Sequence, residues 1–182
     1  SVIDHERLTS MEIDHNVSSN IGRHGSIYRL EEDLLESLKP DLIITQELCD
    51  VCAVSYKDVQ RAARLFEGAP RIISLEPNTL GDVFETILMV GELTGRAQKA
   101  EETVRELRER LARVRNRVQG LRRPRVYAME WLEPPFSGGH WVPEMVEIAG
   151  GQEVLGKPGA KSERITPKSI LDAQPEIIVL MP

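Results

Sequence analysis

The chain has 182 residues, of which 41% are hydrophobic and 29% charged, and its formal net charge is −6. This apolar content is too high for a disordered chain and sufficient for a buried core in one or two domains. The sequence has no apolar run of about 18 residues, as a membrane-spanning helix needs, and its two cysteines are too few for a disulfide framework.

The hydrophobic pattern predicts short strands that alternate with helices. Helices are expected over 10–20, 30–39, 56–66, 79–93, 96–120, 142–149 and 167–173, and strands over 41–46, 71–75, 125–130 and 176–180. Several of these strands are short, continuous apolar runs, which is typical of strands buried in a parallel sheet. Thr79 with Asp82, and Thr166 before Pro167, are suited to beginning helices. The sequence therefore predicts an α/β fold with parallel sheets.

The longest predicted helix, 96–120, carries one apolar seam whose members recur at alternating steps of three and four residues. The seam consists of Ala97, Ala100, Val104, Leu107, Leu111, Val114, Val118 and Leu121. Such a heptad pattern is typical of a coiled-coil dimer, and also suits one long helix that packs on two neighbouring lobes. The two alanines at its start make the seam thin, so we favour the bridging helix.

Basic residues are concentrated in and after this helix. Residues 96–125 hold eleven Lys and Arg against four Glu, whereas the rest of the chain holds 12 basic and 25 acidic residues. Because Glu and Arg are partly interleaved along the helix, we interpret the segment as a solvated, salt-bridged face. The acidic balance elsewhere repels phosphate backbones, which argues against a nucleic-acid partner.

A short repeat indicates two similar, Rossmann-like lobes. Residues 35–44 and 170–179 both run from a helix end through a proline and an acid into branched apolar residues, at a constant offset of 135. We expect a first α/β lobe over 1–95, a single bridging helix over 96–120 and a second α/β lobe over 121–182. Counterparts of 125–130 and of 56–75 would lie before Ser1 and after Pro182, so we expect an internal fragment with both lobes incomplete.

Two loops that follow predicted parallel strands are candidate ligand sites, since α/β proteins bind ligands at the carboxyl ends of such strands. The first loop contains Cys49, Asp50 and Cys52. A C-x-x-C pair between a strand and a helix is compatible with a loop-shaping role, a ligand contact, a disulfide or thiol redox chemistry. Zinc is disfavoured, because the sequence has no second cysteine pair and its histidines lack ligand spacing.

The second loop gathers aromatic residues among Pro and Gly. Four of the chain's eight aromatic residues occur within 127–141: Tyr127 in the predicted strand, and Trp131, Phe136 and Trp141 in the loop. We interpret 131–141 as a binding loop, with a backbone shaped by its Pro and Gly pairs and with rings that face a large apolar ligand. His140 is a candidate axial metal ligand, a hydrogen-bond donor or an ordinary loop residue. No motif of a catalytic nucleophile, a zinc protease or a phosphate-binding loop is present.

Three segments carry a resemblance to a known family: KPDLIITQ at 39–46, CDVCAV at 49–54 and EWLEPPFSGGHWVPEMVEIAGG at 130–151. They are similar to the cobalamin-binding branch of ABC-transporter substrate-binding proteins, the class in which one rigid long helix joins two α/β lobes. The resemblance implies a non-enzymatic, extracytoplasmic protein that binds a corrinoid between its lobes and delivers it to a membrane permease. Cobalamin would be the transported ligand, and the protein would need no cofactor of its own.

The resemblance also implies roles for particular residues. Ligand contacts would come from Cys49, Asp50, Trp131, Pro135, Phe136, His140 and Trp141. One acid on each lobe would dock to arginines of the permease: Glu32 or Asp33 on the first lobe, and Glu153 on the second. The second match is offset by one position, because Gln152 stands where a close relative has the acid.

Different ligands and different classes of protein remain open at this point. A haem or a ferric siderophore is the nearest alternative ligand on the same fold. From other classes, the alternatives are a thiol oxidoreductase that uses Cys49 and Cys52, and a structural dimer that forms through the heptad seam. We also expect a chain with both lobes incomplete to bind ligand weakly and to self-associate through uncovered sheet edges.

Overall fold

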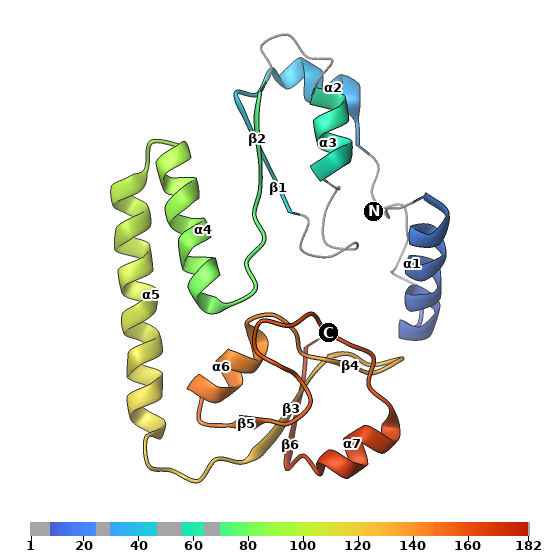
Figure 1. Ribbon diagram of the computed structural model, residues 1–182, viewed down its shortest axis with the longest axis vertical. Coiled ribbons are helices and arrows are strands. Elements are labelled where there is room, and N and C mark those ends of the chain that lie inside the picture. The colour runs from blue at the N-terminus through green and yellow to red at the C-terminus, as the bar shows by residue number, and fades with distance from the viewer. Residues whose placement is uncertain (1–7, 25–29, 47–55, 64–69, 182) are drawn as a thin grey trace. The chain divides into compact units, whose positions relative to one another are not determined.

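The computed structural model describes residues 8–24, 30–46, 56–63 and 70–181 (Figure 1). The chain forms two compact units, Ser1–Glu76 and Pro77–Pro182. The second unit includes helices α4 (Leu80–Leu93) and α5 (Ala97–Val118), the latter being the predicted bridging helix. The division into 1–95, 96–120 and 121–182 stays a prediction.

The described part of the first unit consists of three helices and one pair of parallel strands. It contains α1 (Ser10–His24), α2 (Glu32–Leu38), β1 (Leu42–Thr45), α3 (Tyr56–Ala63) and β2 (Arg71–Ser74). Residues 42–45 of β1 lie opposite 71–74 of β2 in parallel register, which confirms the pairing predicted from the apolar runs. Helix α3 connects the two strands, contacts β2 and buries Val59, Ala62 and Ala63.

The second unit contains a helical hairpin, α4 and α5, and a four-stranded sheet. The further elements are β3 (Arg125–Trp131), β4 (Phe136–Ser137), α6 (Val142–Ile148), β5 (Gln152–Glu153), α7 (Pro167–Ala173) and β6 (Ile177–Leu180). In the sheet, β5 and β6 lie parallel to β3, and β4 lies antiparallel to it. The carbonyls of Val126 and Ala128 accept hydrogen bonds from Val154 and Gly138, so β5 and β4 share one edge of β3 and β6 takes the other.

The sequence does not predict β4 and β5, which have two residues each. Strands this short have no recognisable alternation, and they form here because their backbone groups meet the edge of β3. The core of the unit follows β3, where Val126, Tyr127 and Ala128 are buried. The four side chains of β6 are 42–63% exposed, and self-association through this edge stays a prediction.

The repeat seen in the sequence is present in the structure. Helices α2 and α7, and strands β1 and β6, have the same lengths and lie 135 positions apart at both ends. Each helix is closed by a non-glycine residue in the left-handed conformation, Lys39 in one case and Gln174 in the other, both with φ of 45°. A proline follows each of them and prevents the helix from continuing. The two units therefore share one local design.

The apolar seam of α5 is packed within its own unit at both ends. Near the start, Ala100 and Val104 are buried and α5 lies along α4. The helices approach so closely that a Cβ on Gly91 would lie 2.3 Å from the Cβ of Ala100. Near the end, Val118 contacts Gly150, whose φ is 89°. Both of these contacts lie within the second unit, so the role of α5 as a bridge between two lobes stays a prediction.

Thr79→Ala is expected to destabilise the second unit by about 1 kcal/mol. The Thr79 hydroxyl accepts the N–H of Asp82 (3.1 Å), and the Asp82 carboxylate accepts those of Asn78 (2.9 Å) and Thr79 (2.8 Å). Urea unfolding followed by tryptophan fluorescence measures this, since both tryptophans of the chain lie in the second unit. Thr103→Ala is the matched control, because the Thr103 hydroxyl bonds to Lys99 within α5; equal losses would contradict the prediction.

The same measurement at lower pH belongs to this prediction. Hydrogen bonds from the backbone of Asn78, and then of Thr79, lower the pKa of Asp82 from its ordinary value of 3.8. The folded state favours the charged carboxylate, so the stabilisation is present above pH 3.8 and is lost as the pH falls through the lowered pKa. The destabilising effect of Thr79→Ala should therefore be measured well above that range.

Candidate ligand-binding site

The aromatic loop, residues 131–141, begins with a tight antiparallel hairpin between β3 and β4. Trp131 at the end of β3 lies opposite Phe136, and the register shifts between Met129 and Trp131. Residues directly opposite in a strand pair direct their side chains to one face of the sheet, so Trp131 and Phe136 are neighbours on that face. The indole N–H of Trp131 donates to the carbonyl of Glu133 (3.0 Å), which fixes the ring against the turn.

Tyr127 belongs to the core rather than to this surface. Its side chain is completely buried, and its hydroxyl donates to the carbonyl of Phe136 (2.9 Å). Burial, and then the nearby charge of Glu153, raise the pKa of Tyr127. Tyr127 thus supports the hairpin from the core of the unit. The other three clustered aromatic residues remain candidates for ligand contact.

The glycine pair brings the backbone of the loop close to other segments of the same chain. Gly138 donates its N–H to the carbonyl of Ala128 (2.7 Å). A Cβ on Gly139 would lie 2.4 Å from the backbone nitrogen of Ser162. His140 follows with φ of 53°, a conformation that non-glycine residues rarely adopt. These residues therefore hold the aromatic loop against a second segment.

This second segment, residues 157–165, is named here the partner loop. It bonds to the aromatic loop along its length: Glu163 accepts the N–H of Ser137 (2.9 Å), and Ala160 accepts that of His140 (2.6 Å). The guanidinium of Arg164 lies 5.7 Å from the centre of the Phe136 ring, within range of a cation–π interaction. Sequence reasoning missed this segment because it has no apolar period; only its turn residues and three cations mark it.

A carboxylate joins the two loops. Glu130, near the end of β3, accepts the N–H of Gly139 (3.2 Å) through one oxygen and the hydroxyl of Ser162 (3.3 Å) through the other. One side chain on a strand thus restrains both loops. The aromatic surface is therefore built on a rigid support, as a preformed binding site requires.

Trp141 begins helix α6, and its position is set from two sides. Its ring lies 5.9 Å from that of His140, at an interplanar angle of 44°. One turn further, the Glu144 carboxylate accepts the N–H of Leu80 (2.7 Å) at the start of α4. This bond spans 64 positions in sequence and holds α6 to the first turn of α4. The helix that carries Trp141 is thus fixed to the helical hairpin.

The structure describes some of the remaining candidate residues from the sequence, but not all of them. Cys49 and Asp50, like Cys52, lie outside the described residues. Glu32 and Asp33 are exposed in the first turn of α2, a position at which the helix dipole also favours acidic residues. Pro135 lies in the turn between β3 and β4, and its carbonyl accepts the N–H of Ile165 of the partner loop (2.7 Å).

Glu153 has a different environment from the two acids of α2. One oxygen of its carboxylate accepts the N–H of Ala128 (3.1 Å), and the other accepts three consecutive N–H groups, those of Val154, Leu155 and Gly156 (3.0–3.2 Å). These contacts favour a structural role, in which the carboxylate closes the turn after β5. Docking of a permease by Glu32, Asp33 or Glu153 stays a prediction.

Within the described ranges, no three His, Cys, Asp or Glu side chains form a group able to hold a metal ion. His140 Nε2 is buried and has no hydrogen-bond partner among the described residues. A role of His140 as an axial ligand stays a prediction. No helix in the part of the chain described here has the length and apolar character needed to cross a bilayer.

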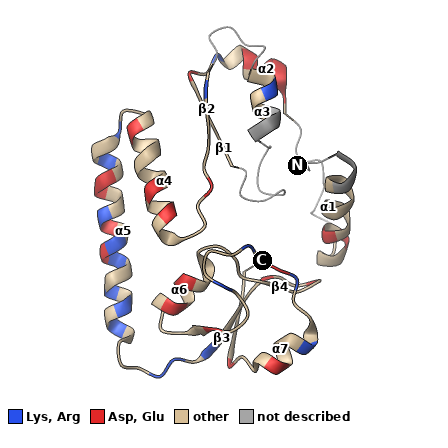
Figure 2. Ribbon diagram, in the orientation of Figure 1, with Lys and Arg blue, Asp and Glu red and all other residues tan. Residues whose placement is uncertain are grey.

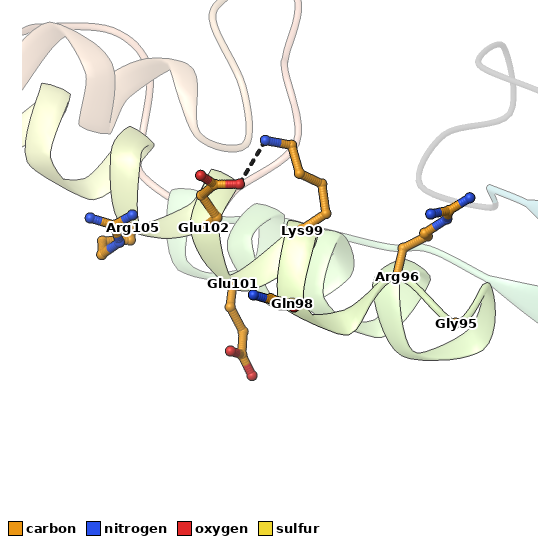
Figure 3. A pocket seen from close by; sticks show the side chains of 7 residues that line it. All are labelled: Gly95, Arg96, Gln98, Lys99, Glu101, Glu102 and Arg105. Carbon is orange, nitrogen blue, oxygen red and sulfur yellow. Dashed lines mark hydrogen bonds and ion pairs between the residues drawn. The ribbon is translucent and has the colours of Figure 1, made fainter.

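A groove of about 660 Å³ lies at the start of α5, away from the aromatic loop (Figure 3). Its walls are polar: Gly95, Arg96, Gln98, Lys99, Glu101, Glu102 and Arg105. Lys99 and Glu102 point toward each other and form an ion pair (2.8 Å), which raises the pKa of Lys99 and lowers that of Glu102. This groove has no aromatic or aliphatic wall for a flat apolar ligand, so the aromatic loop remains the candidate site.

In an α/β fold with parallel strands, ligands bind at the carboxyl ends of the strands, which is where the aromatic loop lies in this chain. Residues 9–182, nearly the whole chain, match the family described as "Periplasmic binding protein". The chain belongs to this family. No curated protein sequence matches the chain.

Solved structures of this fold are similar to the chain at low sequence identity. The periplasmic vitamin B12 binding protein BtuF of Vibrio cholerae is 18% identical, with a TM-score of 0.63, over 84% of this chain and 58% of that one. The periplasmic heme-binding protein RhuT from Roseiflexus is 20% identical, with a TM-score of 0.66, over 84% and 58%. An ABC-type Fe3+-hydroxamate transport protein from Saccharomonospora viridis is 20% identical, with a TM-score of 0.61, over 84% and 53%. The chain thus spans little more than half the length of these proteins.

Proposed function

We propose that the chain is part of the substrate-binding component of an ABC importer and binds a corrinoid on its aromatic loop. In this role the protein works outside the cytoplasm, catalyses no reaction and passes its ligand to a membrane permease. The observation that carries the proposal is the hairpin at the end of β3, in which Trp131 lies opposite Phe136 and Trp141 follows in the same loop. Family membership and the fold shared with a vitamin B12 binding protein support it.

The physical case rests on how large, flat ligands are held. Aromatic rings supply contact area at a low entropic cost, and a site held rigid before binding loses little further freedom. A Trp ring that covers about 150 Å² of ligand contributes at most about 4 kcal/mol at ~25 cal/mol per Å². Glu130 and the bonds to the partner loop supply the rigidity. Cys49, Asp50, Pro135 and His140 are further proposed contacts.

A haem or a ferric siderophore is the second candidate ligand. The fold of this chain is similar to that of a heme-binding protein and an Fe3+-hydroxamate transport protein as well as to that of the vitamin B12 binding protein. The position of Arg164 beside Phe136 favours a ligand that combines an apolar face with an anionic edge, as haem does with its carboxylates.

The proposed contacts to the permease are Glu32, Asp33 and Glu153, which the resemblance to ABC-transporter substrate-binding proteins implies.

Titration of the full-length protein, of which this chain is proposed to be a part, with cyanocobalamin, haemin and a ferric hydroxamate, followed by tryptophan fluorescence, tests the proposal. We expect Trp141→Ala to weaken binding of the preferred ligand by about 30-fold or more, as for a central aromatic contact. Leu132→Ala is the matched control, because Leu132 is an apolar side chain of the same hairpin that is 57% exposed and outside the proposed set. Binding that is weaker than millimolar for every ligand, or equal losses in both variants, would refute the proposal.

A further inference from the structure

The end of α5 and the segment that follows it are strongly basic. Residues 110–125 contain seven arginines and no acidic residue: Arg110, Arg113, Arg115, Arg117, Arg122, Arg123 and Arg125. Figure 2 shows this change of composition along the helix, with Asp and Glu present only in its first part. The interleaved Glu and Arg that suggest a salt-bridged face in the sequence are therefore confined to the part of α5 up to Glu109.

The ion pairs of the helix end where its acids end. Arg105 and Arg113 both approach Glu109, at 3.8 and 4.0 Å, and Arg108 approaches Glu85 of α4 at 4.0 Å. In the described part of the chain, Arg110, Arg115 and Arg117 have no acidic partner. Arg110, Arg113, Arg115 and Arg117, named here the arginine surface, are all exposed.

The three arginines after Arg117 differ, because each is bonded within the unit. Arg122 pairs with Glu176, and Arg123 donates to the carbonyl of Gly151 (2.7 Å). Arg125 donates through Nε to the carbonyl of Ala173 (3.0 Å). These contacts hold the three arginines within the unit and set them apart from the four residues of the arginine surface.

The spacing of the arginine surface places apolar residues between cations. Arg110, Arg113 and Arg117 share one stripe of the helix, since they are separated by three and four positions, and Arg115 lies on the other side of the seam. Val114, between them, is 36% exposed, and Leu121 just beyond the helix is 63% exposed. An exposed apolar strip flanked by arginines is the pattern of helices that lie in the interface of an anionic bilayer.

Neither the helix dipole nor a nucleic-acid partner accounts for the whole of this pattern. The dipole favours cations in the last turn, which explains Arg115 and Arg117 but neither Arg110 nor Arg113. A nucleic acid would pair with arginines but gives no partner to the exposed apolar side chains of Val114 and Leu121. It would also meet the acidic remainder of the chain, with 25 acidic and 12 basic residues outside 96–125.

We propose that the arginine surface is a contact site for the phosphate headgroups of an anionic lipid bilayer. Guanidinium groups bind phosphate through paired N–H donors, and their aliphatic stems extend over an apolar boundary. The proposal does not depend on which ligand the aromatic loop binds, because the two surfaces share no residue.

Sedimentation of the full chain with vesicles tests it. We expect binding to vesicles of equal parts phosphatidylglycerol and phosphatidylcholine to exceed binding to pure phosphatidylcholine by about tenfold or more at low salt. About 0.5 M salt should abolish the difference, since it screens charges beyond a few ångströms. Replacing Arg110, Arg113, Arg115 and Arg117 together with Gln should reduce the binding to anionic vesicles to the level of the neutral ones.

A second variant of equal net charge serves as the control. It replaces four cations that already have acidic partners with Gln: Lys99, Arg105, Arg108 and Lys168. This control should retain anionic-vesicle binding, and unfolding curves should show that both variants are folded. Equal losses in the two variants, or binding of the wild type to duplex DNA but not to anionic vesicles at the same salt concentration, would overturn the proposal.

Discussion

Glu153→Ala is expected to lower the free energy of unfolding of the second unit by about 3 kcal/mol. The reason is the number of donors that lose their acceptor: one N–H of the central strand, at Ala128, and three in the turn after β5. A partly buried N–H without a partner is costly, and hydrogen bonds to a charged acceptor are stronger than those between neutral groups. Urea unfolding monitored by the two tryptophans, both in this unit, measures the loss.

Gln152→Ala is the control, since Gln152 is exposed and is the immediate neighbour in β5. Its effect should stay within about 0.5 kcal/mol, as is usual for surface positions. The comparison also separates two roles of Glu153. If the residue served permease docking alone, Glu153→Ala would leave stability unchanged and impair only transport by the assembled importer. A variant as stable as the wild type would therefore refute the structural role.

Gly139→Ala is expected to destabilise the second unit by roughly 3 kcal/mol and to weaken ligand binding in parallel. The added Cβ would lie 2.4 Å from the nitrogen of Ser162 and 3.0 Å from the carbonyl carbon of Lys161, both of them backbone atoms. Backbone cannot turn aside as a flexible side chain does, so the aromatic loop and the partner loop must separate. That movement also strains the bonds from Glu130 to both loops.

Gly81→Ala provides the matched control. Gly81 lies in the first turn of α4, and the nearest atom to a Cβ there is the Thr79 hydroxyl at 3.5 Å, an ordinary contact. Alanine has the higher helix propensity, so this variant should be neutral or slightly more stable than the wild type. Urea unfolding and ligand titration of the two variants give the comparison. If Gly139→Ala unfolds at the same urea concentration as Gly81→Ala, the close approach of the loops is not essential.

The prediction for Gly139 concerns an architectural point, that the aromatic loop owes its shape to contacts with the rest of the unit. Pro and Gly in the sequence suggest a loop that is rigid by itself. In the structure, Glu130 and the partner loop share that task, and Tyr127 supports the hairpin from the core. Rigidity of this kind keeps the rings in place before the ligand arrives, which reduces the entropic cost of binding.

Much of the fold was predictable from the sequence because the signals are local. Each helix or strand is determined by residues within or next to it in the sequence. These signals are the periodic apolar residues, the caps at Thr79 and Thr166, and the proline that follows the helix in each repeat. The repeat shows the same helix–strand design at an offset of 135, and the structure confirms it at every boundary. The cluster of aromatic residues after the strand at 125–130 likewise indicated the candidate site before any contact was known.

Only the tertiary structure decided which segment lies beside that site and which acids are structural. The bonds between 135–140 and 159–165 join residues about 20 to 30 positions apart, and those of Glu153 to Ala128 span 25. Strands β4 and β5 exist only as partners of β3. Backbone hydrogen bonds of this kind depend on where the chain passes and not on side-chain identity, so a single sequence carries no pattern that specifies them. Side-chain periodicity determined the elements, and long-range backbone pairing determined the site.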